Sequence, residues 1–165
     1  MIDWILTLSY WIHLLATVVW LGGMVLLAVI AWPAWRAQSL DDNQWLLLQK
    51  RFVPWVNGSM VLLWVTGFVQ MTNDANYNGF LSIDSTWAAA MLLKHVAVVA
   101  MMAATLYLQF RVYPALGRLQ LLAAKKPQLA AEEHTRLQFQ ERRWLWINLI
   151  CAAIILFFTA IATAV

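Results

Sequence analysis

Two histidines and one lysine lie inside long apolar segments of this sequence, and these three residues are the best candidates for chemistry. His13 lies in the first apolar segment, and the adjacent Lys94 and His95 lie in the third. An ionisable side chain within such a segment is costly unless it is paired, so it usually marks a functional site. Imidazole is a strong axial ligand of haem iron, and a porphyrin fits between helices with apolar walls. We therefore expect His13 and His95 to be the metal ligands of a b-type haem.

The depth of the two histidines supports a shared ligand. If both segments enter the membrane from the same side, a rise of about 1.5 Å per residue puts His13 roughly 14 Å and His95 roughly 12 Å below that surface. The choice between Lys94 and His95 stays open at this stage. When Pro33 and Pro114 are aligned, His13 corresponds to Lys94, yet a neutral imidazole is a better iron ligand than an ammonium group. Lys94 would then neutralise a haem propionate.

The walls of this expected site come from the same two segments. Trp20 and Met24 share the helix face of His13, and Met102 lies beyond His95 in the third segment. We expect Trp20, Met24 and Met102 to pack against the macrocycle. The glycine pair at 22–23 is small enough for another helix or a flat ring to approach closely.

The elements that must position these residues are membrane helices. Of the 165 residues, 63% are hydrophobic and 12% are charged, a balance that no soluble domain of this size tolerates. A hydrocarbon core of about 30 Å needs about 20 apolar residues per crossing. Four stretches meet that requirement, namely 4–32, 52–71, 87–113 and 144–165. The sequence predicts an all-α integral membrane protein, with one four-helix domain over residues 1–165.

An internal repeat organises the four segments into two tandem helical hairpins. Trp-Pro-Ala at 32–34 resembles Tyr-Pro-Ala at 113–115, and each motif closes a long apolar segment. The segments that follow begin with Lys50-Arg51-Phe52 and Arg142-Arg143-Trp144, and we align Asn57 in one with Asn148 in the other. Two hairpins of the same orientation are related by an axis along the membrane normal.

The charged residues predict the orientation. Basic residues concentrate in the loops that join the two segments of each hairpin, whereas the loop at 72–86 holds Asp74 and Asp84 and no basic residue. The positive-inside rule then places both termini on the non-cytoplasmic side of a membrane that is expected to be the bacterial inner membrane. The net charge of +3 follows from this topology and the anionic lipid surface, so nucleic acid is not an expected partner.

The remaining polar residues give weaker indications. The stretch at 116–141 repeats near helical period, so it should extend the third and fourth helices beyond the membrane, with His134 exposed to solvent. Acidic residues occur only near the segment ends, which argues against a proton-coupled transporter built on carboxylates. The lone Cys151 excludes an internal disulfide and is expected to be a packing residue.

Several stretches of the sequence also resemble a known family. The stretches that carry the resemblance are 13–24, 32–34, 50–52, 65–67, 92–94 and 113–114. They are similar to the order of features in CopD-like membrane proteins and in HemJ-type protoporphyrinogen oxidases. The HemJ-type resemblance implies a haem-associated bundle in which a helix-one histidine and a helix-three lysine matter, matching His13 and Lys94. The CopD-like resemblance implies copper handling instead. The sequence differs from many CopD-like chains in having Leu108, not a histidine, near the end of helix three.

Four functions remain open on the sequence alone. The first is a b-type cytochrome that carries single electrons through a bis-histidine haem, with a quinone or a partner subunit as redox partner. The second is copper transport or resistance through soft ligands such as His13, Met24, Met91 and Met102. The third is porphyrin oxidation of the HemJ type. The fourth is an accessory subunit of a larger membrane complex or a homo-oligomer, in contact with lipid.

Overall fold

The computed structural model describes residues 4–77, 79, 83–123 and 126–164, and every regular element in these ranges is helical. The elements in chain order are α1 (Trp4–Val25), η1 (Leu26–Ala31), α2 (Trp32–Arg36), α3 (Asp42–Thr72), α4 (Thr86–Tyr107), η2 (Leu108–Val112), α5 (Tyr113–Ala123) and α6 (Pro127–Ala164). Four continuous helices of this described part are long and apolar enough to cross a membrane: Trp4–Arg36, Asp42–Thr72, Thr86–Leu119 and Gln128–Ala164. The predicted all-α membrane bundle is confirmed.

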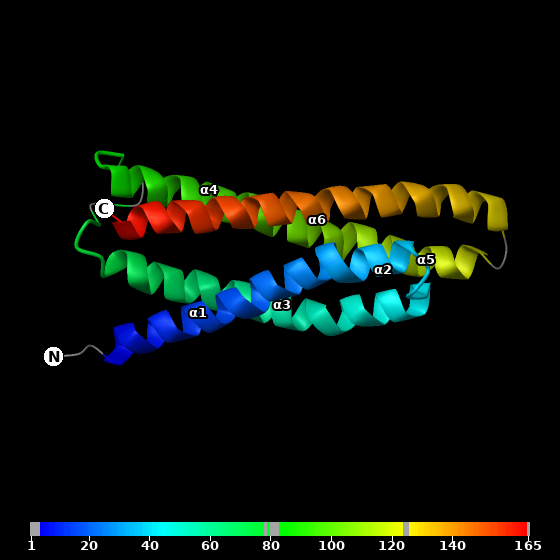
Figure 1. Cartoon of the computed structure of the whole chain (residues 1–165), viewed down its shortest axis with the longest axis horizontal. Coiled ribbons are helices and arrows are strands. Elements are labelled where there is room, and N and C mark those ends of the chain that lie inside the picture. Colours follow the sequence, from blue (N-terminus) through cyan, green and yellow to red (C-terminus); the bar gives the residue numbers. More distant parts are fainter. Residues whose placement is uncertain (1–3, 78, 80–82, 124–125, 165) are drawn as a thin grey trace.

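The four spans form two antiparallel pairs. Helix α1 packs along α3, and α4 packs along α6 (Figure 1). Helices α1 and α4 begin, and α6 ends, at one end of the bundle, which we call the terminal end (Figure 1). At the other end, α2 is followed by α3, and α5 by α6; we call it the basic end because Arg36, Lys50 and Arg142 lie there. Helices α1 and α4 therefore run parallel, as the hairpin repeat requires.

Helices α3 and α6 are longer than the apolar stretches that predicted them. Helix α3 begins at Asp42, ten residues before the expected position 52, because a capping box starts it. The Asp41 carboxylate accepts a hydrogen bond from the Gln44 backbone N–H at 2.7 Å, and the Gln44 side-chain oxygen accepts one from the Asp41 N–H at 3.0 Å. Helix α6 begins at Pro127 rather than 144, which confirms the expected extension beyond the apolar stretch.

Each hairpin contains a π-helical segment directly before its proline motif. Segment η1 precedes Pro33, and η2 precedes Pro114. The Trp32 N–H bonds to the Leu27 carbonyl, and the Tyr113 N–H bonds to the Leu108 carbonyl, so both bonds span five residues instead of four. A proline has no N–H and disturbs the preceding turn, which accounts for the wider turn at both places. The repeat seen in the sequence is therefore also a repeat of backbone geometry.

The repeat extends to the buried faces of α3 and α6, at a constant offset of 92 residues. Equivalent buried pairs are Trp45 and Leu137, Gln49 and Glu141, Val56 and Asn148, Ser59 and Cys151, and Met60 and Ala152. The alignment of Asn57 with Asn148 is thus wrong by one residue, because Asn148 is fully buried and Asn57 is exposed. Asn148 accepts a hydrogen bond from Thr105 at 3.0 Å and so joins α6 to α4.

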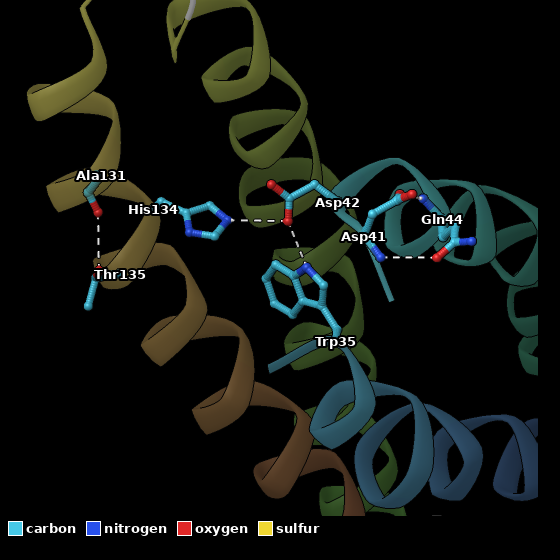
Figure 2. Close-up of polar contacts among 7 residues, drawn as sticks. All are labelled: Trp35, Asp41, Asp42, Gln44, Ala131, His134 and Thr135. Carbon is cyan, nitrogen blue, oxygen red and sulfur yellow. Dashed lines mark hydrogen bonds and ion pairs between the residues drawn. The ribbon is translucent and has the colours of Figure 1, made fainter. Parts of the chain in front are cut away.

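A polar and aromatic contact joins the hairpins at the basic end. Trp35 and Trp45 stack with ring centroids 5.1 Å apart, and each is 1% exposed. Asp42 accepts a hydrogen bond from Trp35 Nε1 at 2.8 Å and lies 3.7 Å from His134 Nε2 (Figure 2). The His134 and Trp35 rings also meet in an edge-to-face arrangement, with centroids 5.6 Å apart. His134, expected to be solvent-exposed, is partly covered by this contact and keeps 30% of its side chain exposed.

Candidate functional site

His13 is held in the interface between α1 and α3. Its Nδ1 lies 2.8 Å from Thr66 Oγ1, and the Thr66 hydroxyl donates to the Leu62 carbonyl at 2.6 Å. Since the hydroxyl proton is used by that carbonyl, Nδ1 must carry the proton of the imidazole. The unprotonated nitrogen of His13 is then Nε2. A histidine oriented in this way through Nδ1 has the arrangement found in many metal-ligating histidines.

His95 is oriented through the same nitrogen on α4. Its Nδ1 lies 2.6 Å from the Met91 carbonyl oxygen, which only accepts, so Nδ1 carries the proton. The imidazole ring faces Phe68 of α3 with centroids 6.4 Å apart. In both imidazoles Nδ1 is thus the hydrogen-bond donor, and the ring positions are set by α3 and by their own helices.

The two histidines lie at one level of the bundle but contact different sides of α3. His13 contacts Thr66 and packs its Cε1 3.5 Å from the position of a Cβ at Gly67, whereas His95 contacts the next residue, Phe68. Successive helical residues point about 100° apart, so neighbouring positions on α3 face different directions. The half-buried Lys94 acts electrostatically on His13, which brings Lys94 into the same site.

Trp20, Met24 and Met102, the expected walls of the macrocycle, gather near the middle of the bundle. Trp20 and Met24 are each 4% exposed and belong to one packed cluster, and Met102 packs against it. Met102 Sδ also accepts a hydrogen bond from Trp64 Nε1 at 2.6 Å. These residues do come together, but side chains from other helices fill the space around them.

The haem interpretation finds no support in this packing. Phe52 fills the space beside the glycine pair, since a Cβ at Gly23 would lie 2.7 Å from Phe52 Cε1. The cavity between Met24 and Gln49 has a volume of about 20 Å³. Pockets for sizeable organic ligands measure about 300–1,000 Å³, so this cavity is suited to water rather than to a porphyrin.

The cluster contains a concentration of sulfur that the sequence analysis missed. Each of the four spans contributes one buried sulfur atom, and we call this group the central sulfur cluster: Met24 of α1, Met60 of α3, Met101 of α4 and Cys151 of α6. All four side chains are at most 9% exposed. The neighbours are mainly apolar, including Val56, Ala152 and Trp20. Thioether and thiol sulfur in such surroundings are the ligand types preferred by Cu(I).

A second group of methionines lies nearer the terminal end. Met71 of α3 is buried against Trp87, and Met91 of α4 packs on the same group. Met60 and Met71 are eleven residues apart, as are Met91 and Met102, which is about three helical turns. Each pair therefore lies on one helix face. The methionines look scattered along the sequence, but this eleven-residue spacing is the signal that predicts their grouping on common helix faces.

The common protein metal ligands other than methionine are not grouped in the same way in the described residues. Within residues 4–77, 79, 83–123 and 126–164, no three side chains of the His, Cys, Asp or Glu type lie together in a way that would hold a metal ion.

The fold and this interior define an integral membrane protein with four spans in the described residues, made of two similar helical hairpins around a sulfur-rich centre. The chain matches the CopD family, described as copper resistance protein D, over residues 46–162, and it belongs to that family. The match begins within α3, so it does not include α1 and His13. No curated protein and no solved structure matches the chain.

Proposed function

We propose that this membrane protein binds copper as Cu(I) at the central sulfur cluster, as part of copper handling in the membrane. The observation that carries the proposal is the convergence of Met24, Met60, Met101 and Cys151, one from each span, in one buried cluster. Membership of the CopD family supports copper as the metal.

The chemistry of the cluster favours the reduced ion. Cu(I) is soft and is selected by thioether and thiolate sulfur, whereas Cu(II) prefers nitrogen and oxygen ligands in a square arrangement. A monovalent ion is also less costly to place in an apolar interior than a divalent one. Cys151 is free, so its thiol is available to lose a proton to the solvent when the metal binds.

Lys94 explains why the sulfur atoms, rather than His13, are the proposed copper ligands. Lys94 acts on His13, so a protonated Lys94 would repel a cation at the imidazole. Along α4, Lys94 stands between Met91 and Met101 and thus between the two methionine groups. When protonated, Lys94 would favour retention of copper in the central cluster over free passage to the terminal end.

We propose the orientation expected from the charges, with both termini on the non-cytoplasmic side of a bacterial inner membrane. The basic end then faces the cytoplasm, where the anionic leaflet attracts its arginines and lysines. Arg36 and Arg142, from different hairpins, both lie over the Trp32 ring, at 5.7 and 5.4 Å from its centroid. This aromatic and cationic edge is typical of a membrane boundary.

The proposal is tested by copper titration of the purified protein in detergent under reducing conditions, with a Cu(I) chelator as competitor. We expect at least a tenfold loss of Cu(I) affinity in Met60→Leu combined with Met101→Leu, because leucine keeps the volume and removes the thioethers. Met71→Leu is the matched control and should retain the affinity of the unchanged protein. Equal affinity in all three proteins contradicts the proposal, as does a visible Soret band that disappears in His13→Ala, which would restore the haem interpretation.

A further inference from the structure

Glu141 is a fully buried carboxyl group at the basic end. Its side chain on α6 is 0% exposed, and its Oε1 accepts a hydrogen bond from Gln49 Nε2 of α3 at 2.5 Å. The other carboxyl oxygen, Oε2, is buried without a hydrogen-bond partner, as is Oε1 of Gln49. In the sequence Glu141 lies just before the fourth apolar stretch, and the extension of α3 and α6 beyond their apolar stretches encloses it.

No cation in the described part of the chain neutralises this carboxyl group. The ion pairs found there join His134 to Asp42 and Arg136 to Glu133, and neither involves Glu141. The groups that face Glu141 are Trp45 and Gln49 from α3 and the Tyr113 ring from α5. A carboxylate buried without a counter-ion costs several kcal/mol or more, whereas a neutral carboxylic acid does not carry that penalty. The environment therefore favours the acid form.

Gln49 connects the carboxyl group to the small cavity. The Gln49 side chain bonds Glu141 and also lines the cavity of about 20 Å³, together with Tyr113, Thr105 and Met24. A volume of this size holds one water molecule, which needs polar partners such as these amide and hydroxyl groups. Gln49 is therefore the common neighbour of Glu141 and of a cavity with room for one water molecule.

Gln49 and Glu141 are also equivalent residues of the two hairpins, 92 positions apart, and they meet each other at the contact between α3 and α6. Asp42 and His134 have the same separation and meet in the same way nearer the end of the bundle (Figure 2). Residues related by a two-fold axis contact each other when they lie on it. The two pairs therefore mark the pseudo-axis, and Glu141 is its innermost ionisable group in the described residues of this contact.

We propose that Glu141, with Gln49, forms a proton-binding site on this pseudo-axis, in which the carboxyl group is protonated at neutral pH and exchanges its proton with water in the adjoining cavity. Release of the proton to water leaves a carboxylate that retains the hydrogen bond from Gln49 Nε2. The proposal rests on the burial and partners of Glu141 and is independent of copper.

Infrared spectroscopy of the whole protein in lipid nanodiscs tests the site directly, because a protonated carboxyl group has a carbonyl band separate from ionised carboxylates. The chain has three glutamates, Glu132, Glu133 and Glu141, so labelling glutamate with ¹³C at the side-chain carboxyl restricts the isotope shift to these residues. We expect the unchanged protein to show an isotope-sensitive acid band at neutral pH that moves when H₂O is replaced by D₂O.

Glu141→Gln should remove this band while keeping a side chain of the same shape. The control is Glu133→Gln on the same helix, whose exposed carboxylate lies 3.7 Å from Arg136 and should contribute no acid band. The band must persist in this control. The proposal is overturned if the unchanged protein has no such band, if the band survives Glu141→Gln, or if it does not respond to D₂O. The first and third results need no variant, so a folding defect in Glu141→Gln cannot hide them.

Discussion

The contact between Gly23 and Phe52 predicts a large difference between two adjacent glycine substitutions. A Cβ at Gly23 would lie 2.7 Å from Phe52 Cε1 and 3.1 Å from Cδ1, whereas a Cβ at Gly22 meets nothing within 4 Å. Replacing glycine by alanine in a helix gains up to about 1 kcal/mol at either position. Overpacking at position 23 costs about 1–3 kcal/mol, so Gly23→Ala should be less stable than Gly22→Ala by roughly 1–3 kcal/mol.

The assay is reversible unfolding of each variant by SDS in mixed micelles, followed by tryptophan fluorescence. The helical gain is common to both variants, so their difference isolates the contact with Phe52. In a Phe52→Leu background the ring is absent, and the penalty of Gly23→Ala should shrink, which a double-mutant cycle measures. Equal stability of the two alanine variants would refute the close contact between Phe52 and Gly23.

The remaining predictions concern two hydrogen bonds. Thr66→Val removes the acceptor of His13 Nδ1–H, so the free energy of unfolding should fall by about 1–3 kcal/mol. The same substitution should weaken the preference of His13 for a proton on Nδ1, which ¹⁵N NMR measures. An unchanged ¹⁵N spectrum contradicts the assignment of the proton to Nδ1. Asp42→Ala leaves the buried Trp35 N–H without its acceptor and should lower the free energy of unfolding by about 1–3 kcal/mol. His134→Ala should lower it by less than about 1 kcal/mol, because the ion pair between His134 and Asp42 is partly exposed. The same unfolding assay compares them, and the reverse order would show that the ion pair dominates.

The architecture could be predicted because it depends on regular properties of the chain. Four apolar stretches of membrane length predict the spans, and the repeated proline motifs predict two equivalent hairpins. Even the π-helical segments follow from the prolines, since each removes a backbone donor at the same place in its hairpin. The level of His13 and Lys94 also follows from counting residues along parallel helices.

The site itself could not be predicted, because it depends on which faces meet. Met24, Met60, Met101 and Cys151 are far apart in sequence, and only the packing of all four spans brings them into one cluster. The burial of Glu141 could not be predicted, because hydropathy shows only where the apolar stretch of α6 begins, and Glu141 lies before that position. Hydropathy does not show that the capped helix α3 is longer than its apolar stretch and covers Glu141.

The most direct test of the central claim is X-ray absorption at the copper edge of the Cu(I)-loaded protein. We predict a first coordination shell dominated by sulfur, with fewer sulfur ligands after combined Met60→Leu and Met101→Leu and after Cys151→Ser. A shell made of nitrogen or oxygen alone, or a sulfur shell that these substitutions leave unchanged, would contradict copper binding at the central sulfur cluster.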